Sequence, residues 1–217
     1  MRIRVNQTSL YYEIKGVGAP LILLHGNGET HAIFDALAEK LSVSYCVYAV
    51  DSRAHGQSDD ALLDYAEMAQ DVVEFIQLLQ LDKPILYGFS DGGIIGLLLA
   101  MKHPQILSKL IISGANLCPA GIKRRYVLAM RAVYLFTRNS KFKLMLTQPN
   151  IAPEDLCKIK TPTLVLAGSG DVVREAHTKE IAAHIPGASL RILPGESHAS
   201  YVFDNEKLYE ILMPFLS

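Results

Sequence analysis

The strongest candidate for a reactive group is a serine enclosed by glycines. Residues 88–93 read Gly-Phe-Ser-Asp-Gly-Gly, so Ser90 lies in a G-x-S-x-G motif, with the apolar run PILY before it and IIGLLLAM after it. A tight turn between a strand and a helix lifts a serine hydroxyl out of the sheet, and it needs glycine where side chains would collide. We therefore expect Ser90 to be a nucleophile. The alternative is a glycine-rich turn that only lets the helix pack closely on the sheet.

Seven histidines are available as the base that such a serine requires. A serine hydroxyl is a poor nucleophile at neutral pH, and a neighbouring base typically contributes about 10²–10⁴-fold to the rate. His198 is the best placed, because it follows the last strand-like run and the break at Pro194-Gly195. His25 also ends a strand-like run, but it precedes a glycine loop that we expect it to brace by hydrogen bonding. We interpret the other five as surface or structural histidines.

A carboxylate is needed in turn to fix the tautomer of the base and to stabilise its charged form. Asp171, at the end of the run TLVLAGSGD, is the candidate. The preceding strand-like run ends in SGANL, which offers Asn116 and no carboxylate. An alternative role for Asp171 is to cap a helix that starts near Val173. Together Ser90, His198 and Asp171 predict acyl-transfer chemistry.

The segments that must position these residues alternate between short apolar runs and longer stretches of helical period. RIRVN and SLYYEIK predict an antiparallel hairpin at a sheet edge. Six apolar runs follow, with helices expected near residues 33–41, 65–79 and 92–102, between the last two runs and at the C-terminus: LILLHG, YCVYAVD, PILYGFS, KLIISGA, TLVLAGSGD and SLRILPGESH. Continuous apolar strands separated by helices predict an α/β fold, with a mostly parallel sheet covered on both faces.

One stretch, Cys118–Lys160, interrupts this rhythm with about forty residues where a short crossover would suffice. We expect a helix over Ile122–Phe142. No Asp or Glu occurs between Cys118 and Pro153, whereas seven basic residues do: Lys123, Arg124, Arg125, Arg131, Arg138, Lys141 and Lys143. These basic residues are interpreted either as a solvated face or as a surface that attracts anionic substrates or lipid headgroups. Without a repeat or linker, residues 1–217 are expected to form a single domain with residues 118–160 inserted.

Four separated motifs make the chain resemble the α/β-hydrolase superfamily over essentially its whole length. LILLHGNG resembles the oxyanion-loop segment, AVDSRAHGQSD the D-x-R-G-x-G-x-S segment, YGFSDGG the nucleophile elbow, and LVLAGSGD with LPGESH the acid and histidine segments. The order Ser90, Asp171, His198 is the order of nucleophile, acid and histidine in this fold. Ala54 departs from the pattern, where glycine is usual, and predicts a slightly different turn. We interpret Asp51–Ser58 as structural, with an Arg–Asp pair holding the loop.

The resemblance implies further features of the site. The oxyanion donors would be the backbone N–H groups of Asn27 and Asp91. The Asp91 carboxylate would disfavour anionic substrates if it points into the pocket; alternatively, it caps the following helix. Residues 118–160 would form a short helical cap that decides what binds. Its apolar residues would face an acyl chain or a small ring, or would simply dock the helix on its own domain: Tyr126, Met130, Val133, Tyr134 and Phe136.

Composition and charge argue against several other classes. Half of the residues are apolar, a fifth are charged and the formal net charge is −1, which favours a globular protein without a nucleic-acid partner. No apolar stretch approaches the roughly 18–20 residues of a membrane span, and the N-terminus lacks the features of a signal peptide. Three cysteines without a CxxC pair favour a reducing cytoplasm. The absence of a Cys/His cluster or nucleotide motif predicts no metal and no cofactor.

The expected function is hydrolysis of a small carboxylic ester, thioester or lactone through an acyl-enzyme on Ser90. Serine at the elbow argues against dehalogenases and epoxide hydrolases, which carry aspartate at that position. Carbon–carbon bond hydrolysis, perhydrolysis and acyl transfer to another acceptor use the same three residues and stay open. So does a non-catalytic ligand-binding receptor, because the fold alone does not imply catalysis. The sequence leaves the oligomeric state open.

Overall fold

An eight-stranded sheet forms the centre of the protein, whose computed structural model describes residues 1–217. The strand order is β1-β2-β4-β3-β5-β6-β7-β8. β1 pairs antiparallel with β2, and β2 with β4, while every other neighbouring pair is parallel. The strands are β1 (Arg2–Val5), β2 (Thr8–Lys15), β3 (Ala19–Leu24), β4 (Tyr45–Val50), β5 (Ile85–Phe89), β6 (Lys109–Ser113), β7 (Thr163–Gly168) and β8 (Ser189–Leu193). The predicted α/β fold, its mostly parallel sheet and its edge hairpin are confirmed.

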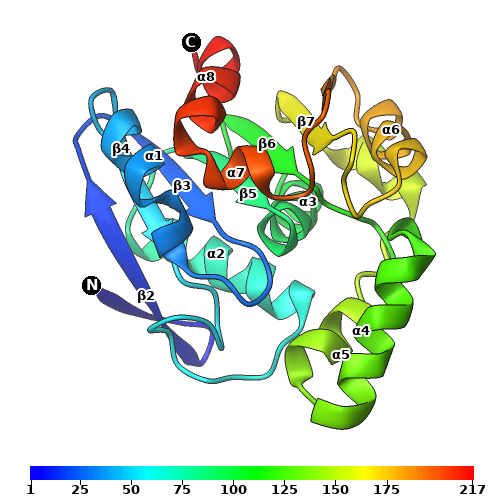
Figure 1. The fold of residues 1–217 in the computed structure, drawn as a ribbon. Helices are drawn as coiled ribbons and strands as arrows, with labels where there is room; N and C mark the ends of the chain where they lie inside the picture. The colour runs from blue at the N-terminus through cyan, green and yellow to red at the C-terminus, as the bar shows by residue number, and fades with distance from the viewer.

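Helices cover both faces of this sheet, and each face has its own apolar core (Figure 1). One core includes side chains of α1 (Asp35–Leu41), α7 (Ser200–Phe203) and α8 (Asn205–Leu216). The larger core includes side chains of α2 (Tyr65–Leu78), α3 (Asp91–Lys102) and α6 (Glu175–His184). None of the helices combines the length and the apolar character that crossing a bilayer requires.

The central strands explain why the functional candidates meet at one edge. Every residue of β5 and of β7 is buried, because helices cover both faces, and their sequences therefore lack polar alternation. Parallel strands end at the same edge of a sheet, and ligands bind at that carboxyl edge in folds of this class. Ser90 follows β5, Gly114 follows β6, Asp171 follows β7 and His198 comes after β8.

Residues 118–160 form two α-helices rather than one. α4 (Arg124–Thr137) ends where Arg138 adopts a left-handed conformation with φ 52°, and the Asn139 side chain caps α5 (Ser140–Thr147) by accepting a hydrogen bond from Lys141 N. The prediction of a single helix over residues 122–142 is therefore wrong. The short helices η2 (Pro119–Gly121) and η3 (Pro153–Lys158) flank the pair. Figure 1 shows α4 and α5 together at one end of the molecule, away from α1 and α8. The single-domain organisation stays a prediction.

Candidate active site

Ser90 occupies a strained turn between β5 and α3. Its φ of 52° and ψ of −111° lie in a region that residues other than glycine rarely adopt. Its backbone N–H donates to Ser113 O at 2.7 Å, which ties the turn to the end of β6. A Cβ on Gly88 would lie 2.2 Å from Gly92 O, and a Cβ on Gly92 would lie 2.2 Å from Leu24 O. The motif glycines therefore allow the backbone to close tightly enough to present the Ser90 side chain.

The three residues predicted for acyl transfer lie in one hydrogen-bonded row. Ser90 Oγ is 3.1 Å from His198 Nε2, and His198 Nδ1 is 2.7 Å from Asp171 Oδ1. Asp171 is 1% exposed, and its Oδ1 also accepts from Val173 N at 2.9 Å. Because α6 begins only at Glu175, this second bond holds the turn before the helix, and the helix-capping alternative is wrong. The catalytic roles of the three residues stay predictions at this point.

Gly114 confines the His198 ring, and sequence reasoning missed it. Its φ is 64°, and a Cβ at this position would lie 2.6 Å from His198 Cε1. On another side the ring contacts Phe89, with 4.9 Å between ring centroids. The imidazole is therefore enclosed between a glycine backbone and an aromatic ring. The available signal was a glycine directly after the apolar run KLIIS, which forms the strand beside that of the serine.

The backbone N–H groups of Asn27 and Asp91 lie at the same pocket as Ser90 and donate to no acceptor within the protein. The loop that carries Asn27 passes close to the serine, since a Cβ on Gly26 would lie 3.0 Å from Ser90 Cβ. The Asn27 side chain donates to Asp91 Oδ2 at 2.9 Å, which links the two residues. The two predicted oxyanion positions are thus adjacent, and their donors are free.

Two carboxylates lie in the wall of this pocket. Asp91 is 3% exposed and accepts from Tyr65 Oη at 2.7 Å as well as from Asn27, so it does not cap the helix that follows it. Burial raises the pKa of Asp91 to about 6, although both hydrogen bonds oppose the rise. Glu29 accepts from Gly26 N at 2.9 Å, and burial also raises the pKa of its carboxyl. Sequence reasoning missed Glu29 and Tyr65.

The pocket itself is small, at about 290 Å³, and apolar residues make up half of its lining. Tyr126 and Met130 of the cap line it, as predicted. Val133, Tyr134 and Phe136 do not, and Phe136 is 90% exposed, so that part of the prediction is wrong. The eighteen lining residues are Gly26, Asn27, Glu29, Tyr65, Phe89, Ser90, Asp91, Gly114, Asn116, Ile122, Tyr126, Ala129, Met130, Met145, Gln148, Val172, Val173 and His198.

Both ends of residues 118–160 are tied to segments that carry site residues. At one end, Lys123 Nζ donates to the backbone carbonyl of Asp171. At the other end, Gln148 accepts from Tyr65 N at 3.1 Å and donates to Asp64 Oδ2 at 2.8 Å. The position of α4 and α5 over the pocket is therefore coupled to the loop of Asp171 and to the start of α2.

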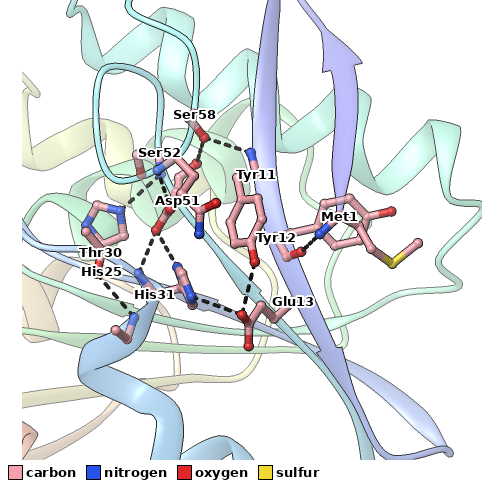
Figure 2. Close-up of polar contacts among 12 residues, drawn as sticks. Met1, Tyr11, Tyr12, Glu13, His25, Thr30, His31, Asp51, Ser52 and Ser58 are labelled. Carbon is pink, nitrogen blue, oxygen red and sulfur yellow. Dashed lines mark hydrogen bonds and ion pairs between the residues drawn. The ribbon is translucent and has the colours of Figure 1, made fainter.

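Buried polar contacts brace the loop that carries Asn27 (Figure 2). His25 Nε2 accepts from Ser52 N at 3.0 Å, and His25 Nδ1 lies 2.7 Å from Gly26 O, so this histidine braces the loop as predicted. The fully buried Asp51 accepts from His31 N at 2.7 Å and from the His31 ring at 2.8 Å. The loop is thus fastened on both sides of its glycines to the end of β4.

An Arg–Asp pair does hold the Asp51–Ser58 loop, but the partner of Arg53 is Asp71 of α2, which lies outside that motif. Arg53 Nε and Nη2 each donate to an Asp71 carboxylate oxygen at 2.6 Å, and both side chains are buried. Ala54 has a φ of 58°, a left-handed conformation that glycine adopts without strain. This conformation explains why the resembling motif usually has glycine there.

One cluster offers three possible metal ligands: the ligand atoms of Glu13, His31 and Asp35 lie within 4.8 Å of one another. His31 Nδ1 is already bonded to Asp51, and its Nε2 lies 3.4 Å from Glu13 Oε1, which also accepts from Tyr11 Oη (Figure 2). These contacts join β2 to the segment before α1 without a further group. His31 and Asp35 are four residues apart in sequence, whereas Glu13 lies eighteen residues before His31, so only the fold brings it to the other two. The expected absence of a metal stays a prediction.

Comparisons with known proteins identify the fold family. The family model described as alpha/beta hydrolase fold matches residues 19–150. The human protein serine hydrolase BPHL is 28% identical over 99% of this chain and 85% of its own length, and the AB hydrolase superfamily protein YisY of Bacillus subtilis is 28% identical over 95% of each. An esterase from Exiguobacterium antarcticum is 25% identical with a TM-score of 0.86, over 99% of this chain and 98% of that one. The chain therefore belongs to the α/β-hydrolase fold family.

Proposed function

We propose that this protein is a serine hydrolase that cleaves a small carboxylic ester or lactone through an acyl-enzyme on Ser90. The observation that carries the proposal is the hydrogen-bonded row in which His198 lies 3.1 Å from Ser90 Oγ and 2.7 Å from Asp171. A nucleophile, a base within reach of it and a group that orients the base are the three requirements for such catalysis.

Each residue of the row has a defined task in the proposed reaction. His198 Nε2 takes the Ser90 Oγ proton while the oxygen attacks the substrate carbonyl carbon. Asp171 keeps the other His198 proton on Nδ1 and stabilises the imidazolium. The imidazolium then protonates the departing alkoxide, which leaves the acyl group on Ser90. In the second half, His198 takes a proton from water, the hydroxide oxygen attacks the acyl-enzyme, and the acid departs as Ser90 regains its proton.

The unused N–H groups of Asn27 and Asp91 are suited to the negative oxygen that forms in each tetrahedral intermediate. They donate to no acceptor within the protein, and both residues line the pocket of Ser90. Donors that are already in place stabilise the developing charge without reorganisation, and removing one such donor commonly costs about 2.7–4 kcal/mol. The Asn27–Asp91 side-chain bond at 2.9 Å supports the shape of this pair of donors.

The pocket favours a small and uncharged acyl group. Its volume of about 290 Å³ lies at the lower end of the usual range for ligand sites. Tyr126, Met130 and Met145 contribute apolar surface suited to a short acyl chain or a small ring. The carboxylates of Asp91 and Glu29 repel an anionic substrate when they are ionised. The esterase at 25% identity supports an ester substrate, and the full-length serine hydrolase relative supports hydrolysis by a serine nucleophile.

The test is the initial rate of hydrolysis of p-nitrophenyl esters of increasing acyl length. We expect Ser90→Ala to lose more than about 10³-fold in kcat while remaining folded. Ser44→Ala is the matched control, because Ser44 is exposed and its hydroxyl makes no hydrogen bond, and it should change the rate by less than about twofold. Retained turnover in Ser90→Ala would remove the serine-hydrolase proposal. Turnover only with another acyl acceptor would replace hydrolysis by acyl transfer.

A further inference from the structure

The charges of this protein are divided between two regions of opposite sign. Residues 118–152 contain seven Lys and Arg and no Asp or Glu, so this segment carries +7, while the rest of the chain carries −8. The formal net charge of −1 therefore conceals a strongly basic cap on an acidic body. A field of this kind orients the molecule toward an anionic surface with the cap in front.

The basic residues of the cap are not used within the protein as ion pairs. All the ion pairs in the structure are formed by residues outside 118–152. Five of the seven basic residues are exposed: Arg124, Arg125, Arg131, Arg138 and Lys143. Their positive charge is therefore available to an external partner.

Large apolar side chains are exposed on the same helix. No residue of α4 is buried, and Leu128, Leu135 and Phe136 are 52%, 62% and 90% exposed. Arg124, Leu128, Arg131 and Leu135 follow one another at intervals of four, three and four residues, so they share one face of α4. Figure 1 shows α4 on the outer edge of the molecule. We call the exposed surface of α4 formed by Arg124, Leu128, Arg131 and Leu135, together with Phe136 on the adjoining side of the last turn, the outer face.

A groove lies between η2 and the first half of α4, where it borders Arg124, Leu128 and Arg131 of the outer face, and it combines both kinds of side chain. Arg124 and Arg131 supply two guanidinium groups, which suit phosphate oxygens. The rest of its lining is apolar: Pro119, Ala120, Ile122, Val127 and Leu128. The opposite side of α4 carries Tyr126 and Met130 of the Ser90 pocket, so the groove and that pocket lie on two sides of one helix.

We propose that the outer face of α4 docks this protein on an anionic lipid surface. The basic residues contact phosphate headgroups, and Phe136 and Leu135 enter the boundary of the acyl region, as in helices that lie in the plane of a membrane interface. A second copy meeting this face with its own outer face would place like charges together. An acidic protein surface would neutralise the positive charge of the cap but would not supply the apolar environment that the exposed Phe136 ring favours. The lipid surface accounts for both observations.

Co-sedimentation with vesicles tests this proposal without any substrate, so its outcome is independent of the proposed hydrolase function. Wild-type protein is mixed with vesicles of phosphatidylcholine alone, or with about 30 mol% phosphatidylglycerol added, at about 0.1 M and about 1 M salt. We expect binding only to the anionic vesicles, and loss of that binding at high salt. Equal binding to neutral vesicles, or none to anionic vesicles, overturns the proposal.

Matched variants assign the binding to α4. Each basic residue at an anionic surface contributes about 1 kcal/mol, or about fivefold in the partition coefficient, so Arg124→Gln/Arg131→Gln should bind about 25-fold more weakly. Phe136→Ser should weaken binding about tenfold. Arg4→Gln/Lys102→Gln removes the same charge from exposed, unpaired positions of the body and should change binding by less than about twofold. Because all these side chains are exposed, thermal midpoints should match the wild type.

Two further outcomes would contradict the lipid assignment. Equal weakening by the cap and the body double variants would show that net charge, rather than the outer face, controls binding. Retention on immobilised polyglutamate that depends on Arg124 and Arg131, without binding to anionic vesicles, would assign the outer face to an acidic protein partner.

Discussion

Replacing Gly114 with alanine places one methyl group directly against the imidazole of His198. The new Cβ would lie 2.6 Å from His198 Cε1 and 2.8 Å from Nδ1, well inside van der Waals contact. Phe89 closes off another side of the ring, so the clash is relieved by a shift of the ring on the order of 1 Å. A misplacement of this size in a catalytic group costs about 10²-fold in rate. We therefore expect kcat/KM for p-nitrophenyl acetate to fall about 100-fold.

Gly187→Ala is the control that separates this clash from backbone strain. Gly187 has a φ of 72°, close to the 64° of Gly114, but a Cβ there would meet nothing within 4 Å. In both variants alanine must adopt a left-handed backbone conformation, which lowers the free energy of unfolding by about 1–2 kcal/mol. Urea unfolding measures this loss. Only Gly114→Ala should lose activity. If its kcat/KM stays within about threefold of that of Gly187→Ala, the position of His198 does not depend on Gly114 and the reasoning fails.

Three further variants test separate contacts. Asp171→Asn should lower kcat about 10⁴-fold in steady-state assays, because the wrong His198 tautomer is then held; a loss below about tenfold would place the acid elsewhere. Burial raises the pKa of Asp91 from 3.8 to about 6, so the folded form binds this proton more tightly and wild-type stability falls as pH rises from about 4 to about 6. Asp91→Asn should not lose stability in this way. Between about pH 4 and about pH 6, the difference in unfolding free energy between wild type and variant should change by roughly 3 kcal/mol. Parallel pH profiles of the two proteins would contradict the raised pKa of Asp91. Arg53→Met leaves the buried Asp71 carboxylate without its ion-pair partner and should lower the free energy of unfolding in urea by about 3–5 kcal/mol. The double variant Arg53→Met/Asp71→Asn should recover part of this loss. A loss below about 1 kcal/mol in Arg53→Met would show that the pair is dispensable.

Local signals in the sequence were sufficient for the sheet and for the position of Ser90. The G-x-S-x-G motif and its two apolar flanks are contiguous, and the structure places Ser90 at the β5–α3 turn. Asp171 and His198 could be placed because parallel strands bring their carboxyl ends to one edge. Strand and turn signals in RIRVN and SLYYEIK also predicted the antiparallel hairpin that β1 and β2 form at an edge of the sheet. The expected cytoplasmic location and the expected absence of a cofactor stay predictions.

Contacts between distant residues were beyond sequence reasoning. Gly114 and His198 lie next to each other in the structure but are eighty-four residues apart in sequence. A glycine after a strand does not reveal which side chain packs against it. Arg53 and Asp71 belong to a loop and a helix, and nothing in their spacing distinguishes Asp71 from Asp51 as the partner. Arg138 ends α4 in a left-handed conformation that usually calls for glycine, so the helix appeared continuous.

The faces of the cap were harder still to assign. Val133 was expected at the pocket together with Tyr126 and Met130, but only contact with the body decides which of these side chains closes the pocket. Phe136 was expected at a pocket wall or at the contact between the cap and the body, and it is 90% exposed instead. The +7 charge of the same segment was visible in the sequence, whereas the absence of any ion pair to it required the structure.

The central claim is that His198 activates Ser90, and intact-mass analysis after incubation with a fluorophosphonate tests it most directly. These reagents react with a serine whose hydroxyl is activated by a neighbouring base. We predict one adduct on the wild type, none on Ser90→Ala and at least about 10²-fold slower labelling of His198→Ala. An adduct that persists in Ser90→Ala, or no adduct on folded wild-type protein, would contradict the account.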